Sequence, residues 1–533
     1  MPDTPRLDAP RADAALVDAL RQDLAAAEYT VERIQELLGP VAAAALRRDQ
    51  GLPARRRLAG SRDPAAILLA LFTLGVDQPD DLVEAALPRL GVDGAVALGL
   101  LEPADPATST PHPAPRMRAR VDLAPYSATD DLGEVQWWIA SDRSELATAE
   151  PLREDHVLGV GGASLTLARI TPREVVGRVL DLGCGCGIQA LHASRHAAQV
   201  VATDLSERAL AFTALNAALN GISLDLRAGS LLEPVTGETF DLIVSNPPFV
   251  ITPRSPSTPL WTYRDGGADG DTLLASLLHA LPDHLAPGGR AVLLGNWEVS
   301  PEEPWDAHPR AWLDGTGLDA WIIQRETEDP AEYAETWVRD GGITGRDPEW
   351  DALAGAWMED FETRDVAAIG FGYLLLSRPA EPDPGAAPVI RAEQVATSGS
   401  GSLGAHLAAG LELLRPLSRL DDDALLALRA VRAPDVVERR HLTPGALDPL
   451  LIEIVQGGGL GRTVRADQML AATLGAADGE LTLGQIIGAV AALTDHDPET
   501  ARQDLAPRLR ELLLGGLLTL PGTAGTPGRV EAP

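Results

Sequence analysis

The chain has 533 residues, 45% of them hydrophobic, and its formal net charge is −33. A chain of this length is expected to form about three domains, and its large negative charge argues against nonspecific binding of nucleic acid. Its two cysteines exclude a disulfide framework. No apolar run approaches roughly 18 residues. Several Asp and Arg side chains lie near the start of the chain, so we expect no membrane span, no signal peptide and a cytoplasmic location.

Residues 1–115 are predicted to form a helical, winged-helix-like N-terminal module. Thr30 precedes a helix over residues 31–38, which ends at Gly39-Pro40. Further helices with apolar faces are expected at residues 64–74, 82–87 and 95–101. Six arginines cluster between these helices: Arg47, Arg48, Arg55, Arg56, Arg57 and Arg62. They can form a solvated surface that balances nearby acidic residues, or a docking patch for a substrate.

A small β-rich segment is predicted at residues 116–158. It follows residues 103–115, where Pro, Thr and Ala are typical of a linker. Alternating arginines from Arg116 onward indicate a strand. Trp137 and Trp138 lie in a second β-like run, and we interpret them as core residues.

The strongest pattern begins with a short apolar run, residues 179–182, interrupted only by Asp181, as expected of a buried parallel strand. Glycines follow at alternate positions: Gly183, Gly185 and Gly187. With the helix predicted at residues 188–195, this order brings a ligand close to bare backbone at a helix N-terminus. The Lys-Ser/Thr ending of a phosphate loop is absent, so a nucleoside triphosphate is not expected.

Two further strand ends carry polar side chains. Asp204 ends the next apolar run, 21 residues past Gly183, at the place where an acidic residue holds a pair of ribose hydroxyls. Residues 240–244 form a predicted strand that runs into Asn246-Pro247-Pro248-Phe249. Because prolines cannot continue a central strand, the chain leaves the sheet there, at its carboxyl end. An amide, a proline carbonyl and an aromatic face then lie at the mouth of the crevice.

In this order and spacing, Asp181-x-Gly183-x-Gly185-x-Gly187, Asp204 and Asn246-Pro247-Pro248-Phe249 resemble the motifs of class I S-adenosylmethionine-dependent methyltransferases. The Asn-Pro-Pro-aromatic tetrad is similar to that of their amino-methylating branch. This branch includes adenine-N6 and guanine-N2 methyltransferases of DNA and RNA and the release-factor glutamine methyltransferases. The resemblance covers roughly residues 157–377. It implies an α/β fold with a Rossmann-like, seven-stranded sheet in a methyltransferase domain at residues 159–380.

The resemblance also implies the site. S-adenosyl-L-methionine is the expected cofactor, held by Asp181, Gly183, Gly185, Gly187, Asp204 and Asn246. The expected catalytic residues are Asn246, Pro247, Pro248 and Phe249. Related enzymes often carry an acidic residue after the third strand that contacts the adenine amino group. This chain has Gly229-Ser230 there, so Ser230 or the backbone is expected to take over that contact.

The tetrad has a chemical logic. A planar amine or amide nitrogen is a poor nucleophile because its lone pair is delocalised. The Asn246 side-chain oxygen and the Pro247 carbonyl can accept its two N–H bonds and support positive charge on nitrogen. Phe249 can stack on the flat target. No separate base is required, because the methylated cation is acidic and loses its proton to water.

Several segments around these motifs leave alternatives open. Residues 155–164 are expected to help enclose cofactor and target, with His156 as a gate or as a structural residue. The Gly266-Gly267 turn is similar to that of the glutamine methyltransferases, although a helix cap by Asp271 also explains this segment. Residues 326–365, with 13 acids against three arginines, are predicted to form an inserted helical lid anchored by tryptophans. Beside the active site, such a lid would repel a phosphate backbone unless its acidic side chains face away. The alternative is a solvated acidic segment unrelated to the substrate.

Residues 381–402 are predicted to be a linker, and residues 403–533 a helical, winged-helix-like C-terminal domain. Helices are expected from Thr482 and from Pro498, the latter with proline at its first position. No Arg-rich recognition face accompanies them, so we expect this domain to pack against protein.

The preferred function from the sequence is methyl transfer to a base amine of RNA or DNA, because N-terminal modules with arginine patches suit a large substrate. The alternative is a protein glutamine amide, favoured by the net charge and the Gly266-Gly267 turn. A small-molecule substrate and a noncatalytic binding protein are further alternatives, and the intact motifs argue against the last. No metal is expected, because Cys184 and Cys186 lack further ligand partners.

Overall fold

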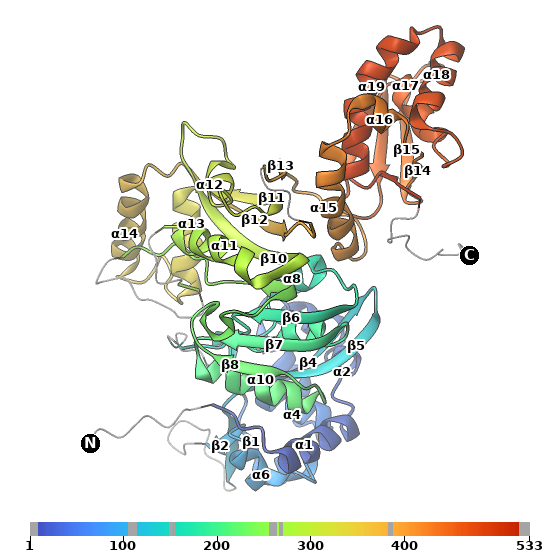
Figure 1. The fold of residues 1–533 in the computed structure, drawn as a ribbon. Helices are drawn as coiled ribbons and strands as arrows, with labels where there is room; N and C mark the ends of the chain where they lie inside the picture. The colour runs from blue at the N-terminus through green and yellow to red at the C-terminus, as the bar shows by residue number, and fades with distance from the viewer. Residues whose placement is uncertain are drawn as a thin grey trace.

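The computed structural model describes residues 9–104, 115–148, 153, 155–254, 264–265, 270–381 and 387–521. The N-terminal part lies below a central sheet, an inserted pair of helices lies to its left, and the C-terminal part lies at the upper right (Figure 1). In the described residues, no helix combines the length and the apolar character needed to cross a membrane.

The centre of the molecule is a mainly parallel sheet with helices on both faces, which confirms the expected α/β class. Its strands are β6 (Val176–Leu182), β7 (Ala197–Asp204), β8 (Asp225–Ala228), β9 (Phe240–Ser245), β10 (Leu285–Val299), β11 (Asp319–Glu328), β12 (Ala368–Ser377) and β13 (Ile390–Gln394). They follow the order β13-β11-β12-β10-β9-β6-β7-β8. Neighbouring residues such as Val179 and Leu180 are both fully buried but belong to different apolar clusters, one on each face of the sheet.

The sheet has eight strands in the described residues, one more than the expected seven. The additional strand is β13, whose residues pair in parallel with β11 from Ala320↔Ile390 to Gln324↔Gln394. These residues lie in the segment predicted to be a linker, residues 381–402. Strand β13 has only five residues and lies at the edge of the sheet, where it pairs with one neighbour. So short a strand carries no clear pattern in the sequence.

Five helices surround the sheet near the motifs: α8 (Gly162–Ile170), α9 (Ile188–Ala193), α10 (Glu207–Leu219), α11 (Thr272–His284) and α12 (Ala307–Ala311). Helices α13 (Pro330–Asp340) and α14 (Trp350–Thr363) form the predicted insertion between β11 and β12. Trp357 is buried, while Trp337 and Trp350 are half-buried. The tryptophans therefore anchor the insertion to the body, as expected.

The N-terminal module contains α1 (Ala14–Ala26), α2 (Val31–Leu46), α3 (Gly51–Leu58), α4 (Pro64–Phe72), β1 (Gln78–Pro79), α5 (Asp80–Ala86), α6 (Gly91–Ala97), β2 (Leu101–Pro103) and β3 (Arg116–Ala119). Helix α2 breaks at Gly39, where φ is 69°, and then continues to Leu46. From α4 onward, the elements follow the helix–strand–helix–helix–strand–strand order of a winged helix.

The predicted boundary at residue 115 divides one sheet. Strand β3 pairs with both β1 and β2, so residues 103–115 connect two strands of the N-terminal module instead of linking two domains. Met117 and Ala119 are buried on the inner face of β3. The alternating pattern of β3 predicts a strand, but it does not predict which strands pair with it.

A hairpin of β4 (Asp122–Asp130) and β5 (Gly133–Ser141) joins this module to the central domain. Asn216 on α10 acts as a pairing partner for β5: it accepts a hydrogen bond from the Ala140 amide at 2.7 Å and donates to its carbonyl at 2.8 Å. It also donates to the Cys186 carbonyl at 2.8 Å. Trp138 donates to the Tyr29 carbonyl at 2.7 Å, so the hairpin contacts both neighbours.

The C-terminal part is mainly helical, as expected, and also contains short strands. It contains α15 (Gly404–Ser418), α16 (Asp422–Leu426), β14 (Val431–Arg432), β15 (Val436–His441), β16 (Leu451–Gln456), β17 (Thr463–Ala466), α17 (Gln468–Gly475), α18 (Leu483–Thr494), α19 (Pro498–Leu514) and β18 (Leu518–Thr519). Strands β15, β16 and β17 form an antiparallel sheet. Arg462 pairs with Glu393 of β13 at 2.6 Å and Arg415 with Asp319 of β11 at 2.5 Å, which fastens this part to the central sheet.

Candidate functional site

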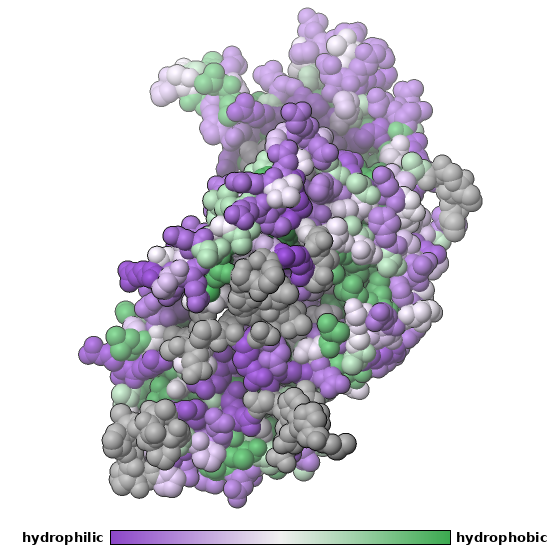
Figure 2. All heavy atoms as spheres, turned by 90° about the vertical axis from the view of Figure 1, so that its left-hand side faces the viewer, coloured by the Kyte–Doolittle hydropathy of each residue, from purple (hydrophilic) through white to green (hydrophobic). Residues whose placement is uncertain are grey.

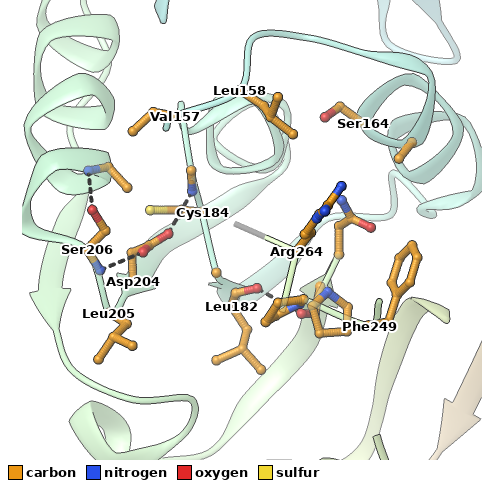
Figure 3. Close-up of a pocket in the computed structure, with 18 of the residues that line it drawn as sticks. Val157, Leu158, Ser164, Leu182, Cys184, Asp204, Leu205, Ser206, Phe249 and Arg264 are labelled. Carbon is orange, nitrogen blue, oxygen red and sulfur yellow. Dashed lines mark hydrogen bonds between the residues drawn. The ribbon is translucent and has the colours of Figure 1, made fainter. Parts of the chain in front are cut away.

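A cavity of about 730 Å³ opens at the carboxyl ends of β6, β7 and β9 (Figure 3). Nine of the ten site residues expected from the sequence line it: Asp181, Gly183, Gly185, Asp204, Ser230, Asn246, Pro247, Pro248 and Phe249. Gly187 does not line the cavity. A crevice outside the carboxyl ends of parallel strands is the usual ligand site of an open α/β sheet.

The glycine turn exposes backbone to the cavity. Gly183, Gly185 and Gly187 all have positive φ, at 75°, 55° and 84°, which only glycine adopts without strain. The amides of Gly183 and Cys184 donate to the Thr203 carbonyl at 2.9 and 3.0 Å. This turn is therefore fixed against β7 and admits a ligand close to its backbone.

The two acidic residues of the motifs have different surroundings. Asp181 is buried and accepts a hydrogen bond from the Ala190 amide at 2.8 Å, at the start of α9. Burial raises the pKa of Asp181 to about 7. Asp204 accepts from the amides of Gly185 at 2.9 Å and Ser206 at 2.8 Å (Figure 3). Burial also raises the pKa of Asp204. Asp204 holds the turn and keeps lone pairs toward the cavity, while Asp181 positions the helix.

Gly187 has a packing role. A Cβ at this position would lie 2.7 Å from the Thr213 Cγ2 atom, closer than carbon atoms approach in proteins. Gly237 has a similar φ of 80°, but a Cβ there would have no described atom within 4 Å outside its chain neighbours.

We expect Gly187→Ala to lower the free energy of unfolding by about 2 kcal/mol, and Gly237→Ala by about 1 kcal/mol. Both variants suffer from the positive φ, but only the first also meets Thr213. Urea denaturation of the two variants and the wild type measures the difference. Equal losses would mean that Thr213 moves aside at no cost.

The Asn-Pro-Pro-Phe segment leaves the sheet directly after β9. The Ser245 hydroxyl donates to the Leu182 carbonyl at 2.8 Å, which ties the segment to the end of β6. The Asn246 Oδ1 atom is buried and has no hydrogen-bond partner among the described residues. A buried acceptor without a donor is costly, and a substrate N–H is the kind of group that satisfies it. The observation fits the predicted role of Asn246.

Residues 155–164 cover the glycine turn, with Val157 and Leu158 on the Cys184 side of the cavity (Figure 3). The Val157 amide donates to Asp142 Oδ2 at 2.8 Å, and Asp142 also forms a buried ion pair with Arg208. His156 lies 3.9 Å from the same carboxylate. Burial lowers the pKa of His156, so its imidazole is neutral at physiological pH. His156 both lines the cavity and lies against Asp142.

The cysteines in the turn behave as small buried side chains. Burial raises the pKa of the Cys186 thiol to about 11, and it also raises the pKa of the Cys184 thiol well above its usual value. Both thiols are therefore protonated at neutral pH, which disfavours reaction and metal binding. The part of the chain that the structure describes contains no group of His, Cys, Asp and Glu side chains suited to a metal ion.

Sequence reasoning did not place several cavity-lining residues at the site, among them Arg264, Trp337 and Asp340. Arg264 extends across the cavity between Phe249 and Ser164 (Figure 3), and its Nη1 donates to Asp340 Oδ2 at 2.6 Å and to the Trp337 carbonyl at 2.9 Å. Trp337 and Asp340 belong to α13, so the insertion forms one wall. The sequence predicts the insertion itself. Its contacts with the cavity depend on packing between residues at least 73 positions apart, such as Arg264 and Trp337.

Asp271 lies at the N-cap position of α11, as expected, but it does not cap the helix with its side chain. It accepts instead from the Glu298 amide at 3.0 Å and contacts His308 Nδ1 at 2.6 Å, and this contact raises the pKa of His308. Gly266 and Gly267 lie outside the described residues.

Comparisons with known proteins agree with this geometry. The family described as "Methyltransferase small domain" matches residues 159–302, and a "Domain of unknown function (DUF7059)" matches residues 26–111. The chain is 35% identical over 242 residues to a release factor glutamine methyltransferase of Cereibacter sphaeroides, which covers 40% of this chain and 84% of that protein.

Two further similar proteins are matched over a smaller share of their own length. A ribosomal protein uL3 glutamine methyltransferase of Bradyrhizobium diazoefficiens is 33% identical over 192 residues, with 33% of this chain and 59% of that protein covered. A T. thermophilus 16S rRNA methyltransferase solved with AdoMet and guanosine is 15% identical, covers 60% of this chain and 68% of that chain, and has a TM-score of 0.26.

The first of these relatives is matched across most of its length. The residues that the family model matches, 159–302, contain the glycine turn, Asp204 and the Asn-Pro-Pro-Phe segment. The expected enzyme class and the expected cofactor, S-adenosylmethionine, are thereby confirmed. The chain belongs to the family of S-adenosylmethionine-dependent methyltransferases that includes the release factor glutamine methyltransferases.

Proposed function

We propose that this methyltransferase acts on the side-chain amide of a glutamine in a protein substrate. The observation that carries the proposal is the 35% identity over 84% of the release factor glutamine methyltransferase of Cereibacter sphaeroides. A second relative of similar identity is named for glutamine methylation of a ribosomal protein. These similarities reverse the order of the two substrate classes that the sequence alone favoured.

The charges around the cavity support a protein amide over a nucleic-acid base. Five carboxylates line it, against two guanidinium groups: Asp155, Asp181, Asp204, Asp265 and Asp340, against Arg254 and Arg264. The insertion that forms one wall has 13 acids and three arginines over residues 326–365. On the face that carries α14, hydrophilic side chains predominate (Figure 2). A phosphate backbone entering here would meet like charge, whereas a neutral amide would not.

The site residues fit the cofactor. The glycine turn offers bare backbone, Asp204 offers a carboxylate for a ribose hydroxyl pair, and Ser230 lies on the cavity wall. When bound, S-adenosylmethionine supplies an electrophilic methyl carbon.

The chain's own residues then act on the amide. Asn246 Oδ1 and the Pro247 carbonyl accept its two N–H bonds, which holds the nitrogen in one orientation and supports the positive charge that develops on it. Phe249 packs against the flat amide, and the segment at residues 155–162 covers the cavity and excludes water. The methylated nitrogen loses its extra proton to water.

The test adds purified protein and tritiated S-adenosylmethionine to lysate from a deletion strain of the source organism, and the labelled product is divided by protease or nuclease digestion. We expect label in a protein, and a peptide mass increase of one methyl group on a glutamine. Asn246→Ala serves as the inactive control. Label that nuclease digestion releases from RNA or DNA would overturn the proposal.

A base amine stays the second candidate because of one observation. All six arginines of the predicted cluster, Arg47 to Arg62, are exposed; they lie directly after α2, on α3 and in the turn that follows α3. Two of them contact backbone carbonyls: Arg55 donates to Leu74 and Arg57 to Leu37. The cluster belongs to a module with the winged-helix order, and the nuclease arm of the same experiment tests it.

A further inference from the structure

The inserted helices share a small apolar core with the chain that follows the Asn-Pro-Pro-Phe segment. Val250 and Ile251 pack there against Tyr333 of α13 and against Trp357 and Phe361 of α14. The insertion is thus in contact with the acceptor side of the cavity, as well as with β11 and β12, the strands between which it is inserted.

The prolines explain why this contact matters. Pro247 and Pro248 have no backbone N–H, so they cannot fix the segment to the protein by donating hydrogen bonds. The amides that follow do so. Val250 donates to the Arg264 carbonyl at 2.9 Å, and Ile251 donates to the Tyr333 hydroxyl oxygen at 3.0 Å.

Both of these hydrogen bonds lead to α13. Tyr333 is itself a residue of α13. Arg264 is joined to the same helix through its side chain, which donates to Asp340 Oδ2 at 2.6 Å and to the Trp337 carbonyl at 2.9 Å. Its guanidinium also lies 5.6 Å from the centre of the Trp337 ring.

Tyr333 is held from several directions. Its side chain is fully buried. Its hydroxyl oxygen accepts a second hydrogen bond, from Asn296 Nδ2 on β10, at 2.6 Å. Trp357, Phe361 and Phe371 surround the ring, each with its centroid 5.7 Å away. One oxygen atom therefore connects the central sheet, the insertion and the backbone after the catalytic segment.

We propose that α13 is a positioning element for methyl transfer and that Tyr333 is its positioning residue. Tyr333 does not line the cavity, so it acts through Ile251 on the segment that carries Asn246 and Phe249. Methyl transfer needs the target nitrogen in line with the methyl group, and a displacement of about 1 Å can cost about 100-fold in rate. For its substrate, this inference rests on the proposed function.

The test is Tyr333→Phe, which keeps the ring and removes the oxygen. We expect kcat to fall by about tenfold or more, with the Kd for S-adenosylmethionine unchanged, because the glycine turn and Asp204 lie away from α13. The matched control is Tyr29→Phe. Tyr29 is also fully buried, and its hydroxyl donates to the Leu123 carbonyl at 3.0 Å in the N-terminal module. The control should lose similar thermal stability and keep kcat.

A second measurement does not need the substrate. Hydrogen exchange followed by mass spectrometry should show faster exchange at residues 249–254 in Tyr333→Phe and no change there in Tyr29→Phe. If the wild-type protein methylates no glutamine, the proposed function fails and the exchange experiment alone decides on Tyr333. Unchanged exchange overturns the positioning role. So does a Tyr333→Phe enzyme whose kcat stays within about twofold of the wild type, or an equal loss of kcat in the control.

Discussion

Asn246→Ala is expected to lower kcat by about 100- to 1,000-fold while the Kd for S-adenosylmethionine changes little. The reason is the buried Asn246 Oδ1 atom, which has no hydrogen-bond partner among the described residues. A group whose hydrogen bond forms with the reacting nitrogen contributes mainly in the transition state, so its loss lowers kcat. Steady-state kinetics with the methylated substrate and calorimetric titration with the cofactor separate the two effects.

Asn246→Asp is the informative companion. It keeps an acceptor oxygen of the same reach, and we therefore expect it to retain more activity than Asn246→Ala. Comparable losses in both variants would mean that the amide group, and not an acceptor oxygen, is required. Equal loss of cofactor affinity and of kcat in Asn246→Ala would assign the residue to cofactor binding instead.

The parts of the site that the sequence predicted depend on short-range geometry. A strand followed by Gly183, Gly185 and Gly187 specifies positive φ at fixed positions, and the structure has positive φ at all three. Two prolines after β9 force the chain out of the sheet wherever the rest of the protein lies. Such features follow from local covalent constraints, so a single sequence was enough to locate the cavity.

The parts that the sequence did not predict depend on pairing between distant residues. Strand β13 forms because it pairs with β11, where Ile390 lies beside Ala320. The five residues of β13 alone do not predict this pairing. Asp271 occupies the position of a helix cap, but the Glu298 amide and His308 compete successfully for its carboxylate. The wall formed by Trp337 and Asp340 likewise exists only once α13 has packed beside Ile251.

The boundaries of the three parts show the same limit. The composition of residues 103–115 and 381–402 is typical of linkers, yet β2 and β3 pair across the first segment and β13 lies within the second. A Pro- and Ala-rich composition indicates that a short segment lacks the periodicity of a helix or a strand. It does not indicate whether the residues on its two sides belong to the same sheet.

Asp204→Ala is expected to raise the Kd for S-adenosylmethionine by roughly 10- to 150-fold, the equivalent of a charge-assisted hydrogen bond worth about 1.5–3 kcal/mol. Asp204 lies at the carboxyl end of β7 and lines the cavity. Its carboxylate already accepts from the amides of Gly185 and Ser206. These bonds hold the carboxylate in place before the cofactor arrives, so little ordering is required for a ribose hydroxyl pair to bind it.

The same two bonds complicate the interpretation, because the substitution also releases amides of the glycine turn. Asp225→Ala on neighbouring β8 removes a carboxylate that pairs with Arg227 and does not line the cavity, so it controls for the loss of nearby negative charge. Asp204→Asn keeps an acceptor for one amide and should preserve more stability than Asp204→Ala. If the alanine variant unfolds normally in urea and binds the cofactor with unchanged affinity, the ribose contact lies elsewhere and Asp204 serves only to fix the turn. If affinity falls in both Asp204 variants but not in Asp225→Ala, the carboxylate itself is what the cofactor requires.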